Sequence, residues 1–332
     1  PIIRLMGAEE KLIQLAVPYL RVYALFSPGI MIFFALDNYL RICGKINYSM
    51  LMNVFTSVGN IALDWLFIAH FGWGIASAAL ASCLCLFAGT IICIWPFLRK
   101  KLVLYFIKTK ISLKTVSNII ANGSSEFFSN ITSSVSMAIM NIVLLRIGGT
   151  TAVAAFTVVM YVDSVVKSLL FGMTDALQPA ISYNYGAMCT KRVYALEKRV
   201  LGAGFLLSVL TLFLMQHHGH ILISLFLTKE GPALLALSTR AMQLFSISYL
   251  FSWFGMITSS FFTALNRPLY SLLVSFGQTL IFPVFFLLVL PIFWQLDGVW
   301  LSSTFASFST CFLAGAFLLS VIKKMPHTKE NA

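Results

Sequence analysis

The chain is dominated by long, continuously apolar segments that are separated by short polar loops. A helix needs about 20 mostly apolar residues to cross the hydrocarbon core of a bilayer. Segments of this kind cover residues 18–40, 48–70, 75–97, 117–145, 151–183, 200–227, 233–264, 268–291 and 299–322. Because they do not alternate between apolar and polar residues, helices fit them better than barrel strands. The sequence therefore predicts an all-α, polytopic membrane bundle of about nine transmembrane helices.

The composition excludes the ordinary soluble classes. Of the 332 residues, 59% are hydrophobic and only 10% are charged, whereas soluble domains carry about 25% charged residues. No P-loop, nucleophile elbow or His-Glu-x-x-His motif occurs in the sequence, so we expect neither an enzyme nor a cofactor. The six cysteines lack the spacing of a metal site or disulfide framework and are interpreted as small core residues.

The basic residues indicate how the chain is oriented. Lys and Arg total 23 against 11 Asp and Glu, and most of them lie in alternate loops, which is typical of a cytoplasmic face rather than of nucleic-acid binding. This places the C-terminus in the cytoplasm and the protein in the cell (inner) membrane. An odd number of spans then places Pro1 outside, although no initiator Met or signal peptide precedes it. We therefore expect that the chain lacks its N-terminal part.

The last third of the sequence repeats the first at an offset of about 222 residues. Tyr48-Ser49 follows a basic turn and matches Tyr270-Ser271, and Gly74 matches Gly298. Corresponding helices run in the same direction, which is typical of transporters built from parallel repeats. We expect two six-helix lobes, the first of which retains only its second half. The expected divisions are 1–98 for the N-terminal lobe, 99–115 for a basic cytoplasmic linker, 116–324 for the C-terminal lobe and 325–332 for a cytoplasmic tail.

Three stretches resemble a known family. They are Asp37-Asn-Tyr-Leu-Arg-Ile-Cys-Gly44, Asn60-Ile-Ala-Leu-Asp64 with the segment that follows it, and Gln178-Pro-Ala-Ile-Ser-Tyr-Asn-Tyr-Gly-Ala187. In this order they resemble the multidrug and toxic compound extrusion (MATE) transporters, particularly the bacterial branch related to DNA-damage-inducible efflux proteins. The resemblance implies a V-shaped pair of six-helix bundles that exports amphipathic, often cationic compounds in exchange for Na⁺ or H⁺ by alternating access.

A candidate cation-coupling site centres on Asn60 and Asp64, which are spaced to share one face of a helix. A carboxylate within the hydrocarbon region is costly and usually faces a polar interior with a partner or ion. Carboxylate, amide and hydroxyl oxygens suit Na⁺, and the carboxylate also suits H⁺. The resemblance adds the hydroxyl of Ser82 on the next helix. It also implies a further Asp on a helix that this chain lacks, so we expect an incomplete ion site.

Further acids lie within the predicted spans. Glu126 is a candidate proton or substrate-cation site, because burial would raise the pKa of a carboxyl there. Asp163 and Lys167 have the spacing of an intrahelical pair, which forms either a structural ion pair or a proton relay.

Two other pairs have candidate structural or gating roles. Asp37 and Arg41 repeat the helical spacing at a cytoplasmic helix end, where they are expected to form a clasp. Gln178 precedes Pro179, which kinks or ends a helix.

Recognition of varied apolar cations calls for aromatic faces and adaptable thioethers. The candidate lining residues are Met137, Met140, Asn141, Met160, Tyr161, Tyr249 and Met256. The expected partners are small amphipathic molecules and membrane lipids, and the protein is expected to be monomeric.

Two alternative functions remain. A lipid-linked oligosaccharide flippase of the same superfamily would need several basic residues in its cavity, whereas only Lys167 is intramembrane. A membrane-embedded transferase would need a metal or phosphate motif, and the sequence contains none.

Overall fold

The computed structural model describes residues 10–100, 102–108, 110, 112–224 and 232–324. Within these ranges the regular secondary structure is entirely helical, which confirms the predicted all-α class. The chain divides into two compact units, Pro1–Lys110 and Ile111–Ala332. We refer to them as the N-terminal and C-terminal units and describe each by itself. Their boundary falls inside the basic segment 99–115, part of which lies outside the described residues, as do the first nine residues of segment 1–98.

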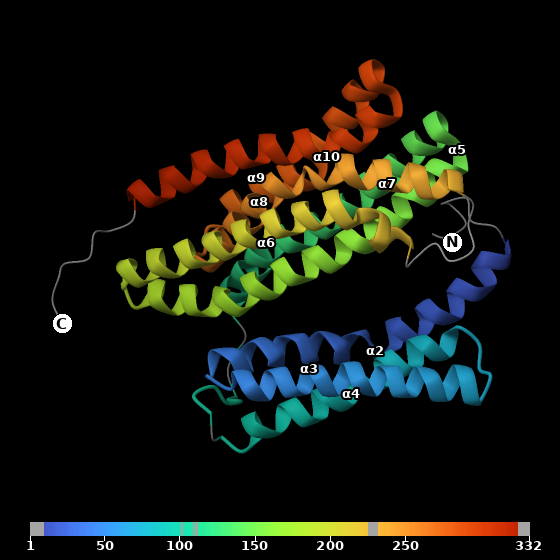
Figure 1. Cartoon of the computed structure of the whole chain (residues 1–332). Coiled ribbons are helices and arrows are strands. Elements are labelled where there is room, and N and C mark those ends of the chain that lie inside the picture. Colours follow the sequence, from blue (N-terminus) through green and yellow to red (C-terminus); the bar gives the residue numbers. More distant parts are fainter. Residues whose placement is uncertain (1–9, 101, 109, 111, 225–231, 325–332) are drawn as a thin grey trace. The chain divides into compact units, whose positions relative to one another are not determined.

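The N-terminal unit consists of three long helices and a π-helical turn (Figure 1, blue to teal). They are α2 (Glu10–Ile42), α3 (Ile46–Asp64), η1 (Trp65–His70) and α4 (Ala76–Leu98). Helix α4 packs against both α2 and α3. Close packing depends on Gly89 of α4, because a Cβ there would lie 2.7 Å from a methyl carbon of Thr56 and 2.8 Å from the ring of Phe33. Small residues commonly allow such close approach between helices in membranes.

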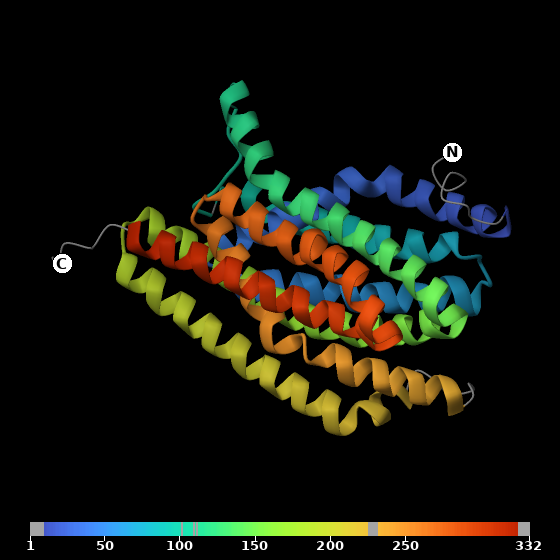
Figure 2. The same ribbon diagram turned by 90° about the horizontal axis from the view of Figure 1, so that it is seen from above.

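The C-terminal unit contains seven elements, from α5 to α10. They are α5 (Leu113–Gly186), α6 (Thr190–Ser224), α7 (Pro232–Ser246), α8 (Tyr249–Ala264), α9 (Pro268–Phe276), η2 (Gly277–Ile281) and α10 (Phe282–Lys324). Helix α5 is kinked at Gly149 (φ 66°, ψ −165°) and α10 at Gln295 (φ 45°, ψ −122°), where the backbone is not helical. Helices α7 and α8 form a bent pair with an angle of 53° between them, and Figure 2 shows this bend.

The described helices agree with the predicted number of spans. Six are long and apolar enough to cross a membrane, and the bent pair of α7 and α8 provides a seventh candidate. The kinks at Gly149 and Gln295 fall in the expected gaps between segments 117–145 and 151–183, and between segments 268–291 and 299–322. Each of the two kinked candidates, Phe127–Gly186 and Pro268–Lys323, is long enough for two spans, and counting them so gives nine in the described part of the chain. Residues 225–227, the expected end of the sixth segment, and the tail 325–332 lie outside the described residues.

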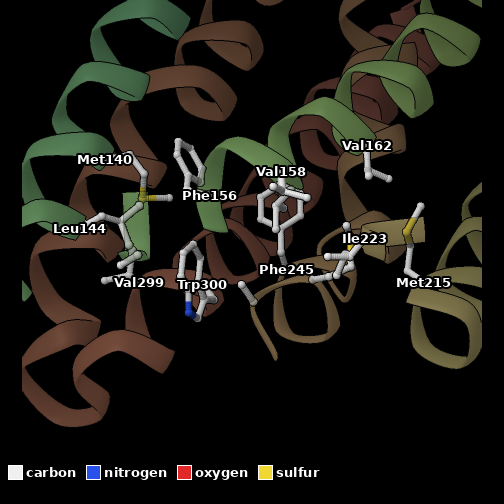
Figure 3. Packing of buried hydrophobic residues seen from close by; sticks show 14 of the residues in the cluster. Met140, Leu144, Phe156, Val158, Val162, Met215, Ile223, Phe245, Val299 and Trp300 are labelled. Carbon is white, nitrogen blue, oxygen red and sulfur yellow. The ribbon is translucent and has the colours of Figure 1, made fainter. Parts of the chain in front are cut away.

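Two apolar clusters form the core of the C-terminal unit. One joins α5, α6, α7 and α10 and includes Met140, Phe156, Phe245 and Trp300 (Figure 3). The rings of Phe156 and Trp300 lie 6.4 Å apart between centroids. The second cluster includes Phe262 and joins α8 to α5, α6, α9 and α10. Large apolar side chains also remain exposed along most helices, which is the arrangement expected of surfaces that face lipid.

Each unit contains a copy of the same helix-turn-helix, which supports the sequence repeat. Gly44 in the turn from α2 to α3 has φ 74°, and Asn266 in the turn from α8 to α9 has φ 55°. Each donates its backbone N–H over 3.0 Å, to the carbonyl oxygen of Arg41 and of Thr263 respectively. Gly and Asn are the residues that most readily adopt this left-handed conformation. The residue that follows makes an equivalent hydrogen bond in each copy. The backbone N–H of Lys45 donates to the carbonyl oxygen of Leu40, and that of Arg267 donates to the carbonyl oxygen of Phe262, both over 2.8 Å.

Candidate functional site

The predicted cation site lies where α3 passes into the π-helical turn. Asp64 is the last residue of α3, and Trp65 begins η1; such π-helical segments are frequent at functional sites. The side-chain amide of Asn60 donates a hydrogen bond of 2.9 Å to the hydroxyl oxygen of Ser82 on α4. The structure therefore joins two of the three predicted residues directly, and Asp64 lies one helical turn after Asn60.

Asp64 has a buried oxygen without a partner. Its Oδ1 atom is shielded from solvent and accepts no hydrogen bond in the described part of the chain. Buried polar atoms are nearly always paired, and leaving one unpaired is costly. Na⁺ or H⁺ would satisfy this oxygen, so the donor set of Asp64, Asn60 and Ser82 fits a small cation chemically. The coupling role of these residues stays a prediction.

The expected ion pair of Asp37 and Arg41 belongs to a larger polar cluster. Arg41 Nη2 lies 2.6 Å from Asp37 Oδ2, and Asp37 is only 5% exposed. The other oxygen of Asp37 accepts hydrogen bonds from the Ser49 hydroxyl and, over 2.8 Å, from the Asn53 amide. Arg41 Nε also donates to Ser49 Oγ over 3.2 Å. The clasp thus joins the end of α2 to the start of α3, and its gating role stays a prediction.

The C-terminal unit contains the same cluster in neutral form. Ser259 on α8 is hydrogen-bonded to Ser271 over 3.0 Å and to Ser275 over 2.8 Å. Thr263 is hydrogen-bonded to Ser271 over 2.8 Å. These four positions follow those of Asp37, Arg41, Ser49 and Asn53 by 222 residues, and the three side-chain contacts are equivalent. Sequence reasoning missed this correspondence, although both sets of four residues have the same spacing.

A cavity of about 750 Å³ lies within the C-terminal unit. Its lining comes from α5, α7, α8, α9, η2 and α10. Seven predicted site residues line it: Met137, Met140, Met160, Asp163, Lys167, Gln178 and Met256. Phe156 and Phe245 add aromatic surface, and Figure 3 shows Phe156 near Met140. The structure therefore brings much of the predicted cavity together within one unit.

Other predicted residues do not line this cavity. Tyr161 is 56% exposed on α5, whereas Asn141 lines a separate, apolar pocket of about 240 Å³ with Ile142 and Leu145. Helical geometry explains why Tyr161 and Asn141 do not line the cavity. Each follows a lining methionine in the sequence, and consecutive residues point about 100° apart around a helix. Pro179 lies inside α5, which continues to Gly186 and does not end at the proline.

The predicted acid Glu126 also lies on α5. Its side chain is outside the described part of the structure. The role suggested for it from the sequence stays a prediction.

A second acid, Asp163, is held by two partners at the wall of the cavity. Lys167 Nζ lies 2.6 Å from Asp163 Oδ2, and the hydroxyl of Tyr249 on α8 donates to Asp163 Oδ1 over 3.0 Å. Tyr249 is 2% exposed and does not line the cavity. It therefore orients the carboxylate of Asp163 from outside the cavity lining, whereas the sequence predicts Tyr249 to be part of the lining itself.

Hydroxyl groups form the part of the cavity that sequence reasoning missed. They lie on α5, on α8 and the residue before it, on α9 and η2, and on α10: Ser129, Ser133, Ser136, Thr174, Ser248, Ser252, Ser259, Ser260, Thr263, Ser275, Thr279, Ser303 and Ser307. Several recur at spacings of three or four within apolar segments, which places them on one helix face. That spacing was the available signal. The hydroxyls can donate to or accept from a ligand without adding net charge.

Comparisons with known proteins agree with this architecture. The multidrug export protein MepA of Staphylococcus aureus (strain N315) is 24% identical over 325 residues, which cover 96% of this chain and 70% of MepA. The protein of the same name from Staphylococcus haemolyticus (strain JCSC1435) is 25% identical over 318 residues, or 94% and 69% of the two chains. A solved structure described as the outward-facing conformation of a multidrug resistance MATE family transporter has a TM-score of 0.92. It is 22% identical, over 98% of this chain and 73% of that one.

The family model named MatE matches two stretches, residues 1–66 and 127–288. The two matches end 222 residues apart, at equivalent positions of the repeat described above. Together they cover more than half of the sequence. The chain therefore belongs to the multidrug and toxic compound extrusion (MATE) family of membrane transporters.

Proposed function

We propose that the protein is a secondary antiporter that exports amphipathic, often cationic compounds in exchange for Na⁺ or H⁺. In this proposal the N-terminal unit binds the coupling ion near Asp64, and the C-terminal unit contributes its cavity to the substrate path. Alternating access links the two, with ion binding biasing the equilibrium between conformations. The multidrug export named for the staphylococcal relatives supports the same substrate class.

The observation that carries the ion-coupling proposal is the unpartnered, buried Oδ1 of Asp64. A membrane-embedded acid is a functional candidate by default, because its cost has to be offset. The hydrogen bond from Asn60 to Ser82 uses the amide N–H as donor. The amide oxygen of Asn60 is not needed for that bond and is available to a cation in the same region.

The cavity of the C-terminal unit supports the substrate class. Its volume of about 750 Å³ lies within the range of roughly 300–1,000 Å³ typical of sites for drug-sized molecules. Methionine and phenylalanine side chains offer adaptable apolar surface, and the hydroxyls offer polar contacts without fixed charge. The basic residue of this cavity, Lys167, is already paired with Asp163. This arrangement favours exporters of amphipathic compounds over a flippase that binds pyrophosphate.

The proposal also covers the location, oligomeric state and partners of the protein. We place the protein in the cell (inner) membrane as a monomer, with its C-terminus in the cytoplasm. Its partners are small amphipathic molecules and lipids, and it uses no cofactor other than the coupling ion.

The test is uptake of ethidium into liposomes that contain the purified protein, driven by an imposed Na⁺ or H⁺ gradient. Asp64→Asn removes the charge at nearly constant volume and should abolish gradient-driven uptake without reducing insertion into the membrane. Asp297→Asn is the matched control, because Asp297 forms an exposed ion pair with Arg240. The Asp297→Asn variant should transport normally. Uptake by the wild type that ignores both gradients would refute the antiport mechanism. Full uptake by Asp64→Asn would remove Asp64 from it.

A further inference from the structure

We propose that the ammonium of Lys167 is a tethered competitor for organic cations: it occupies Asp163, and a cationic substrate binds in the cavity by displacing it. This inference rests on the proposed function for the class of compound that enters the cavity. It assigns Lys167 as a residue that sets affinity, a role distinct from a permanent structural ion pair or a proton relay.

The two members of the pair differ in mobility and access. Asp163 is 3% exposed, and Tyr249 fixes one of its oxygens from α8. The side chain of Lys167 is 52% exposed and holds the other oxygen over 2.6 Å. A lysine head group is a compact charge on a flexible four-carbon stem, so it can leave while the carboxylate keeps its position. The acid is thus a fixed receptor and the lysine is its removable ligand.

The surroundings of the pair suit a larger cation. Asp163 and Lys167 both line the cavity, together with Met160 and Phe156 from the same helix and Phe245 from α7. Aromatic faces and thioethers attract cations that carry apolar groups, whereas a lysine ammonium brings no aromatic surface of its own. An aromatic cation can therefore replace the charge of Lys167 at Asp163 and also fill apolar space that the lysine leaves empty.

Tethering makes this competition strong. A competitor on the same helix has a high effective concentration, on the order of millimolar or above for short flexible tethers. Apparent affinity falls in proportion to the fraction of sites that are open. If Lys167 occupies Asp163 in about nine molecules of ten, its removal should tighten binding of an organic cation about tenfold. When no substrate is bound, the ion pair with Lys167 also avoids the cost of leaving the buried carboxylate of Asp163 without a partner.

The experiment measures binding of tetraphenylphosphonium to the purified protein by titration calorimetry in detergent. Lys167→Met and Lys167→Gln should each bind about tenfold more tightly than the wild type. Lys167→Arg keeps a positive charge and should resemble the wild type, as should Lys198→Met, which removes an exposed basic residue from α6. Tetraphenylborate has the same shape with a negative charge, and its binding should not tighten in either neutral variant. Thermal melting and monodisperse elution establish that each variant is folded.

Removing the receptor separates this inference from simpler explanations. Asp163→Asn should weaken tetraphenylphosphonium binding, and adding Lys167→Met to it should give no further gain. Unchanged affinity in both neutral variants, on a protein that does bind the cation, overturns the inference and leaves the proposed function standing. A gain that persists in the double variant also overturns it, because the effect then does not pass through Asp163. Absence of binding in every variant overturns both the inference and the substrate class proposed above.

Discussion

Ser49 and Ser271 occupy the same position in two copies of one polar turn. Ser49 donates to Asp37 and accepts from Arg41, and Ser271 is hydrogen-bonded to Ser259 and Thr263 at the equivalent positions. The backbone of the turn is the same in both copies, whereas the side chains are ionic in the N-terminal unit and neutral in the C-terminal unit. The same turn is therefore stabilised by charged side chains in one unit and by neutral hydroxyls in the other, and this difference can be tested.

We predict that Asp37→Ala is one of the more destabilising polar substitutions in the chain. It leaves Arg41 without its carboxylate and removes the acceptor of Ser49 and Asn53. Breaking one side of a largely buried pair costs about 3 kcal/mol or more. Ser259→Ala, at the equivalent position, removes neutral hydrogen bonds only and should cost about 1 kcal/mol. Thermal unfolding in detergent compares the two variants, and equal losses would show that the charge is irrelevant.

The same turn predicts non-additive behaviour. Replacing Asp37 by Ser and Arg41 by Thr together gives these two positions the residues of their C-terminal equivalents, Ser259 and Thr263. Because neither charge is then left without its partner, the double variant should lose less stability than Asp37→Ser alone. The coupling free energy in a double-mutant cycle should be about 1–3 kcal/mol. Additive losses would mean that Arg41 and Asp37 do not depend on each other.

The hydrogen bond between Asn60 and Ser82 in the N-terminal unit leads to a prediction about ion affinity. Ser82→Ala removes the acceptor of the Asn60 amide, so the amide is no longer held in a fixed orientation. A lost positioning contact of about 1 kcal/mol corresponds to a several-fold weaker ion response. Na⁺-dependent changes in tryptophan fluorescence would measure it, and Ser82→Thr, which keeps the hydroxyl, should behave like the wild type. The prediction fails if Ser82→Ala and the wild type respond at the same Na⁺ concentration.

Much of this architecture was predictable from the sequence, for a physical reason. Length and apolarity fix transmembrane helices strongly, and the breaks at Gly149 and Gln295 fell between the predicted segments. Spacing of four residues also indicated the pairs of Asp37 with Arg41 and of Asp163 with Lys167. In contrast, Tyr249 was assigned to the cavity and instead contacts Asp163 from a buried position. Tertiary packing determines which helix each face contacts, and the local spacing of residues in one sequence does not reveal those contacts.

Gly298 provides a prediction about the kink in α10. A Cβ at this position would lie 2.5 Å from the backbone oxygen of Leu290 and 2.9 Å from the backbone nitrogen of Pro291. Backbone atoms cannot rotate away as side chains do, so Gly298→Ala should force a shift that costs about 1–3 kcal/mol. Gly202 on α6 is the matched control, because no atom lies within 4 Å of a Cβ built there. Gly202→Ala should be neutral or slightly stabilising. Melting temperatures of the two variants decide the matter, and similar values would contradict close packing at the kink.

The last prediction concerns the hydroxyl of Tyr249, which holds Asp163 over 3.0 Å from α8. Tyr249→Phe keeps the ring in the apolar cluster around Phe245 but removes the donor to a buried carboxylate. Hydrogen bonds to charged groups contribute about 1.5–3 kcal/mol, so the variant should unfold at a lower temperature than the wild type. If the hydroxyl matters only through Asp163, the same substitution made in Asp163→Asn should cost less, because the charge that strengthens the bond is gone. An equal loss in both backgrounds would mean that Tyr249 stabilises the C-terminal unit independently of the acid.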